Sequence, residues 1–277
     1  MKKKYLFVTA ALGLTVMLSS CEKEDILPGS EITQPGQSTT PGSTPATPGT
    51  TPPANTPQNG TGTQITRLGA RTFSYDAQQR LVEVGYTYTE NDGYTVVYEG
   101  NKPVRLNYKG GNNYMLYTYA GDKVVEAKSY YGENKVNYHY TFEYNGDLLV
   151  KQTQLSYATS DQGRLNVVNY EYSPAGNLVK LTTAWSTSNR VEDLGQPSVI
   201  TFGNFDNRQH PEAFIANSMF FLPGVQLFQN NPGYRDPGTG KEMYAYTFND
   251  KGYPVQRQTK LEAYPHVQPH LDGYEYR

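Results

Sequence analysis

The sequence is poor in cysteine, tryptophan and histidine: its 277 residues contain one cysteine, one tryptophan and four histidines. A single cysteine excludes a disulfide bond within the chain. An excess of either charge is also missing, because 24 basic and 26 acidic residues give a formal charge of −2. Such a balance lacks the basic face of a dedicated nucleic-acid-binding protein, so we expect no nucleic-acid partner.

Tyrosine, glycine and proline are abundant, with 25, 26 and 18 copies. An aromatic content of 13% argues against a wholly disordered chain. The many glycines and prolines argue against a helical bundle. We therefore expect at least one folded domain that is not helical.

The first twenty residues are typical of a secretory signal peptide. Lys2, Lys3 and Lys4 precede an apolar run from Tyr5 to Leu18, which is too short to span a bilayer core of ~30 Å as a helix. The ending Leu18-Ser19-Ser20-Cys21 resembles the lipobox of bacterial lipoproteins. The resemblance implies that Cys21 is lipidated and begins the mature chain. An ordinary signal peptide with an incidental cysteine is the alternative.

Residues 21–64 are predicted to be a lipidated, disordered stalk. Glu22, Lys23, Glu24 and Asp25 are similar to the surface-export signal of Bacteroidota lipoproteins, a lysine followed by two acids. This similarity implies a position on the cell surface, anchored in the outer membrane, although a solvated charged stretch would look the same. The following Pro, Gly, Thr and Ser residues cannot bury a core.

Residues 65–277 are predicted to form a tyrosine-rich β-repeat domain. The repeat has two aromatic residues one position apart, a polar turn and an alternating apolar run. Five copies begin at Phe73, Tyr117, Phe142, Tyr170 and Tyr246, and a sixth, weaker copy has the single aromatic Tyr98.

Each repeat has the pattern of a β-hairpin. Alternating aromatics place two rings on one face of a strand, and Asn, Asp and Gly supply the turn. Successive hairpins predict an all-β antiparallel meander, which is an extended, twisted sheet that is open or partly closed.

The repeat resembles the YD repeat of Rhs-type proteins. The stretches Phe205–Glu212 and Phe248–Val255 are similar to Bacteroidota YD-repeat-like lipoproteins that carry a domain of unknown function. The resemblance implies a β-repeat fold for 65–277 and brings no established activity. Six copies are too few for the closed cage of a long Rhs shell.

One segment interrupts the repeats. Pro211 and the spacing of Phe214, Ile215 and Met219 predict a short helix over 211–219. Its apolar residues would fill the core or line a ligand site.

No catalytic motif is present. His266 and His270 have a helical metal-ligand spacing, but Pro265 and Pro269 break such a helix. The recurring turn aspartates are expected to shape turns. We expect no metal, no cofactor and no enzymatic activity, although a carboxylate pair for glycan hydrolysis stays open.

The tyrosines are the best functional lead, because period-two alternation turns some of them toward solvent. Exposed aromatics suit glycans or protein partners. The predicted binding surface comprises Tyr86, Tyr88, Tyr117, Tyr119, Tyr138, Tyr140 and Trp185. We expect a non-catalytic envelope protein that binds a glycan or protein; an assembly partner of an outer-membrane complex and an apolar-ligand carrier are alternatives.

Overall fold

The computed structural model describes residues 64–132, 134–211 and 220–277. Several predictions therefore fall outside the described residues: the signal peptide 1–20, the stalk up to residue 63, and the helix, apart from Pro211, which lies in a bend. The residues Cys21, Glu22, Lys23, Glu24 and Asp25 lie outside as well. Within the described residues the helical structure is one 3-10 turn, Val191–Asp193. In this part of the chain, no helix has the length and apolar character needed to cross a membrane.

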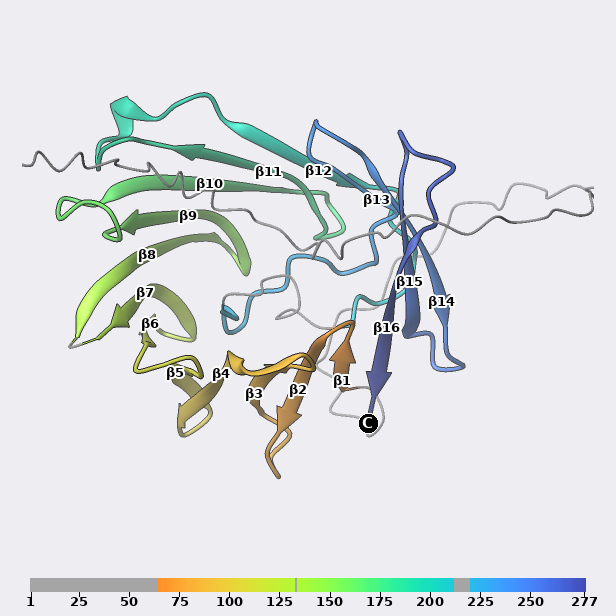
Figure 1. Ribbon diagram of the computed structural model, residues 1–277, viewed down its shortest axis with the longest axis horizontal. Helices are drawn as coiled ribbons and strands as arrows, with labels where there is room; N and C mark the ends of the chain where they lie inside the picture. The colour runs from red at the N-terminus through yellow and green to blue at the C-terminus, as the bar shows by residue number, and fades with distance from the viewer. Residues whose placement is uncertain (1–63, 133, 212–219) are drawn as a thin grey trace, which may run out of the picture. The chain divides into compact units, whose positions relative to one another are not determined.

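Sixteen antiparallel strands form a closed barrel in which each strand pairs with its neighbours in the sequence (Figure 1). The strands are β1 (Ile65–Leu68), β2 (Arg71–Tyr75), β3 (Leu81–Tyr86), β4 (Thr89–Glu99), β5 (Lys102–Tyr108), β6 (Tyr114–Ala120), β7 (Lys123–Tyr131), β8 (Lys135–Asn145), β9 (Leu148–Ser156), β10 (Arg164–Tyr172), β11 (Leu178–Trp185), β12 (Ser198–Gly203), β13 (Tyr234–Asp236), β14 (Glu242–Phe248), β15 (Pro254–Leu261) and β16 (His270–Tyr276). The all-β meander predicted from the sequence is thereby confirmed.

The expectation of an open or partly closed sheet is corrected by the contact between β1 and β16. Ile65 pairs with Tyr276 and Leu68 with Tyr274, so the first and last strands meet. Sheet twist accumulates over sixteen strands, and closure removes both exposed edges.

All six predicted hairpins are present. They are β2–β3, β4–β5, β6–β7, β8–β9, β10–β11 and β14–β15. Each has a register shift next to its second aromatic residue, for example between Thr118 and Tyr119. The polar turn follows, and Gly121 and Gly146 there have φ values of 62° and 57°, which glycine adopts without strain.

Tyrosine hydroxyls join several of the hairpins to the preceding strand. The Tyr98 hydroxyl donates to the Leu81 carbonyl at 2.8 Å, and the Tyr119 hydroxyl donates to the Pro103 carbonyl at 2.7 Å. Tyr144 repeats the contact on Val124. Repeated caps of this kind fix the lateral spacing of neighbouring hairpins.

The barrel interior holds the apolar core. Inward-facing side chains such as Tyr117, Tyr140 and Phe142 pack against Phe220 and Phe221, from the segment between β12 and β13 that crosses the inside of the barrel (Figure 1). Around β13–β16 the interior instead carries ion pairs, Arg235–Glu242 and Arg257–Asp272. The interior is therefore filled and is not an empty cage.

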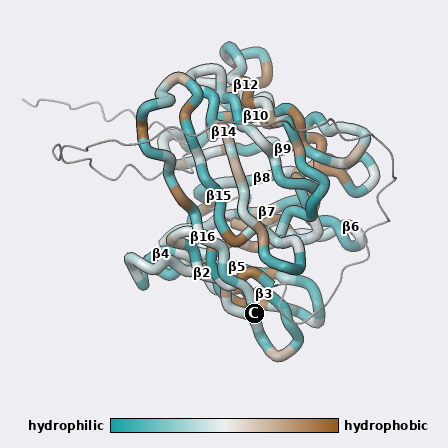
Figure 2. The backbone as a smooth tube through the Cα atoms, turned by 90° about the vertical axis from the view of Figure 1, so that its right-hand side faces the viewer, coloured by the Kyte–Doolittle hydropathy of each residue, from teal (hydrophilic) through white to brown (hydrophobic). Residues whose placement is uncertain are grey.

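The outer face of the barrel is polar. Ion pairs lie there between neighbouring strands, at Lys151–Glu143 and Lys180–Glu171, and along β7, at Lys128–Glu126, with nitrogen–oxygen distances of 2.7–2.8 Å. Figure 2 shows hydrophobic and hydrophilic positions interspersed along the strands. The buried apolar residues thus face inward, whereas charged residues lie both on the outer face and in the ion pairs inside β13–β16.

The two ends of the barrel differ. The turn end carries the six hairpin turns together with Gln64 and the C-terminal Arg277. The Arg277 guanidinium donates hydrogen bonds to the side chains of Gln64 and Gln79. The opposite end, here the mouth, carries the connections at residues 87–88, 109–113 and 157–163, together with Gly132 and Asn134.

Candidate functional site

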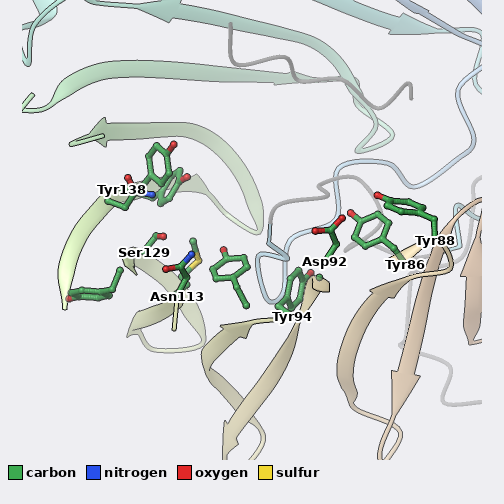
Figure 3. Close-up of a pocket in the computed structure, with 13 residues that line it drawn as sticks. Tyr86, Tyr88, Asp92, Tyr94, Asn113, Ser129 and Tyr138 are labelled. Carbon is green, nitrogen blue, oxygen red and sulfur yellow. The ribbon is translucent and has the colours of Figure 1, made fainter. Parts of the chain in front are cut away.

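A cavity of about 400 Å³ opens at the mouth, within strands β3 to β8 (Figure 3). Thirteen residues line it, and seven of these are tyrosines. The lining residues are Tyr86, Tyr88, Asp92, Gly93, Tyr94, Tyr108, Asn113, Met115, Ser129, Tyr130, Asn137, Tyr138 and Tyr140.

The β3–β4 hairpin positions one wall of the cavity. Tyr94 pairs with Val84, and Gly93 beside it has a φ of 97°. A Cβ atom on Gly93 would lie 2.1 Å from the Val84 carbonyl oxygen, so a larger residue does not fit. This close approach sets the direction of Asp92 and Tyr94, which alternate onto one face of β4.

The tyrosine rings are arranged at angles to one another. The ring centroids of Tyr86 and Tyr88 are 5.4 Å apart and tilted by 50°, and those of Tyr138 and Tyr140 are 6.0 Å apart and tilted by 37°. Rings packed in this way present both faces and edges to a ligand. Asn113, Ser129 and Asn137 add hydrogen-bonding groups between the rings.

The buried phenols of the cavity are neutral donors at physiological pH. Burial is the largest influence, and it raises the pKa of Tyr94, Tyr108 and Tyr140 above the ordinary value of about 10. Their hydroxyls can therefore both donate and accept hydrogen bonds.

The predicted binding surface is divided by the fold. Tyr86, Tyr88, Tyr138 and Tyr140 line the cavity together. Tyr117 is 7% exposed in the core, and its hydroxyl donates to the Phe221 carbonyl. Tyr119 lies at the turn end on Pro103. Trp185 is 44% exposed and does not line the cavity, although the ladder through Asn166 and Gln154 places it on the same face as Tyr140.

Several lining residues are absent from the predicted set. Tyr94 and Tyr108 could have been found from strand alternation, because they pair directly with each other across β4 and β5. Asp92, Asn113 and Asn137 carry no such signal. Only the closed barrel brings them to one opening.

The aspartates and histidines have local roles. Asp76 Oδ1 accepts the backbone N–H groups of Gln78 and Arg80, as expected for a turn-forming residue. His270 begins β16, with Nε2 3.1 Å from Asp272 Oδ1. Within the described residues, no three His, Cys, Asp or Glu side chains gather as a metal site requires.

Fold and cavity together define a closed antiparallel barrel with a tyrosine-lined mouth. The fold is similar to that of a porin-like protein from Bacteroides vulgatus ATCC 8482, with a TM-score of 0.54, 14% identity, and coverage of 78% of this chain and 98% of that one. A porin-like protein from Bacteroides uniformis ATCC 8492 superposes more loosely, with a TM-score of 0.47, 16% identity, and coverage of 75% and 88%. No protein-family model and no curated protein matches the sequence. The comparisons thus bear on the fold alone.

Proposed function

We propose that the protein is a non-catalytic, lipid-anchored binding protein of the bacterial outer membrane that holds a glycan in the tyrosine-lined cavity. The observation that carries this proposal is the cavity itself, in which neutral phenols, amides and a carboxylate surround about 400 Å³. That volume suits a small ligand better than a protein surface. Aromatic faces with many hydrogen-bonding groups suit a sugar better than a wholly apolar ligand.

The polar outer face supports anchoring by lipid instead of by spanning strands. A transmembrane barrel needs an outward apolar band and has a polar interior. Here the ion pairs Lys128–Glu126 and Lys151–Glu143 lie on the outer face, and Phe220 and Phe221 fill the interior. The barrel accordingly stands in water, held by lipid on Cys21 through the stalk.

This arrangement fits the lipoproteins with YD-like repeats that the sequence resembles, and the export signal at Glu22–Asp25 would place the barrel on the cell surface. Glycan hydrolysis fits less well. It normally requires two carboxyl groups flanking the scissile bond, and among the described lining residues only Asp92 has one.

The proposal is tested by oligosaccharide binding to the full-length protein in mild detergent. Tyr138→Ala should weaken binding of the preferred oligosaccharide by about tenfold, which is ~1.4 kcal/mol, because a stacking ring is lost. Tyr264→Ala is the matched control, since Tyr264 is 53% exposed in the β15–β16 loop and does not line the cavity. Equal losses in both variants, or no binding across neutral, basic and acidic oligosaccharides, would contradict the proposal.

A further inference from the structure

We propose that the glycan held in the cavity is an amino sugar, whose protonated amine is bound by Asp92 between the rings of Tyr86 and Tyr94. The inference rests on the proposed glycan-binding function and specifies the chemical class of its ligand. It depends on three features: the charge of the lining, the lack of an internal partner for the Asp92 carboxylate in the described part of the chain, and the placement of the rings.

The lining carries a negative charge. Within the part of the chain that the structure describes, its thirteen residues include one carboxylate, at Asp92, and no lysine, arginine or histidine. Such a lining favours cationic over anionic ligands, because opposite charges attract.

Asp92 differs from the acidic residues that form ion pairs on the strands. Glu83 binds Lys109 at 2.6 Å, Glu126 binds Lys128 at 2.8 Å, and Asp272 binds Arg257 at 2.7 Å. The Asp92 carboxylate has no hydrogen bond or ion pair within the described part of the chain, and it is exposed at the cavity. It is therefore available to a ligand without breaking an internal contact.

Aromatic rings surround this carboxylate. Figure 3 shows Asp92 between Tyr94 on one side and Tyr86 and Tyr88 on the other. A cation near the face of an aromatic ring is attracted by the ring quadrupole. A carboxylate beside tilted tyrosines thus offers an ammonium group a charge partner and a π surface together.

Arg71 is the residue whose positive charge would favour an anionic ligand instead. It pairs with Tyr86 across β2 and β3, its guanidinium interacts electrostatically with the Tyr86 and Tyr94 phenols, and burial lowers its pKa. Arg71 is not among the lining residues, whereas Asp92 is. An acidic sugar is accordingly the competing outcome of the test.

The experiment compares glucosamine, N-acetylglucosamine and galacturonic acid hexamers on the full-length protein by calorimetry. A pH of about 5.5 keeps the amines of the glucosamine hexamer protonated. We expect the glucosamine hexamer to bind at least tenfold more tightly than its N-acetylated counterpart. Asp92→Asn should abolish this preference.

Asp161→Asn is the matched control, because it removes the same charge from an exposed loop at the mouth end without touching the lining. It should keep the preference. Equal affinities for the basic and neutral hexamers in the wild-type protein, or a preference for the acidic one, would overturn the amino-sugar inference and leave the glycan proposal standing. Failure of all three hexamers to bind would overturn both.

Discussion

At the scale of single residues, the tyrosines divide into two kinds according to where their hydroxyls lie. Tyr98 and Tyr119 use theirs to cap a backbone carbonyl at the turn end. Tyr86 and Tyr138 line the cavity at the mouth. Local sequence separates the two kinds in part, because Tyr98 and Tyr119 come directly before a polar hairpin turn and Tyr86 and Tyr138 do not.

Removal of one capping hydroxyl tests how much the tyrosines at the turn end stabilise the fold. Tyr98→Phe keeps the ring, over which the Arg80 guanidinium lies at 4.4 Å, but leaves the Leu81 carbonyl without its donor. We expect the free energy of unfolding to fall by ~1 kcal/mol. Tyr264→Phe, at a 53% exposed residue, should change it by less than ~0.5 kcal/mol. Urea unfolding of both variants measures the difference. Equal changes in the free energy of unfolding would show that the capping hydrogen bond does not stabilise the fold.

At the scale of elements, the hairpins are connected at their turn ends by a ladder of side chains. Lys102 binds the Gly121 carbonyl at 2.7 Å and lies 5.4 Å from the ring centre of Tyr119. Lys123 makes the same contacts with Gly146 and Tyr144. Each turn thus holds the next one, and the repetition follows from the sequence repeat.

This ladder predicts a loss of stability at high pH. Burial raises the pKa of Tyr98, Tyr119 and Tyr144 to about 12, whereas the unfolded chain has the ordinary value of about 10. Below pH ~10 these phenols are protonated in both the folded and the unfolded chain, so their stabilisation of the fold is fully present. Between pH ~10 and ~12 the phenols lose their protons in the unfolded chain and keep them in the folded protein, so the free energy of unfolding falls as pH rises. Melting temperature measured against pH, together with phenolate absorbance, checks the window. A melting temperature that stays constant up to pH ~12 would contradict the assignment.

The hairpins were predictable because each depends on about ten consecutive residues with a strong alternation and a turn signal. The β12–β13 pair was not, because its three-residue strand β13 follows a segment of about thirty residues without the repeat pattern. The sequence did not predict whether the barrel closes, because closure depends on the pairing of Ile65 with Tyr276 from opposite ends of the domain. The cavity depends on that closure, and only four of the seven residues in the predicted surface line it.

At the scale of the whole molecule, Gln64 and the cavity lie at opposite ends of the barrel. Gln64 lies at the turn end, where Arg277 binds its side chain at 2.9 Å. The cavity opens at the mouth, past Tyr86 and Tyr88. In the proposed position of the barrel on the cell surface, a ligand from outside the cell would enter through this mouth.

Protease treatment of intact cells tests this placement. The stalk predicted for 21–64 should be cut first, because its Pro, Thr and Gly residues cannot form a protective core, whereas the closed barrel has no free strand edge and resists cleavage. We expect a fragment containing residues 65–277 in the medium of unbroken cells, still able to bind the oligosaccharide. A Cys21→Ser variant should appear in the medium without protease, because it lacks the lipid. Release of the barrel only after the outer membrane is opened would contradict the surface position implied by Glu22–Asp25, and the ligand would then have to be a glycan of the periplasm.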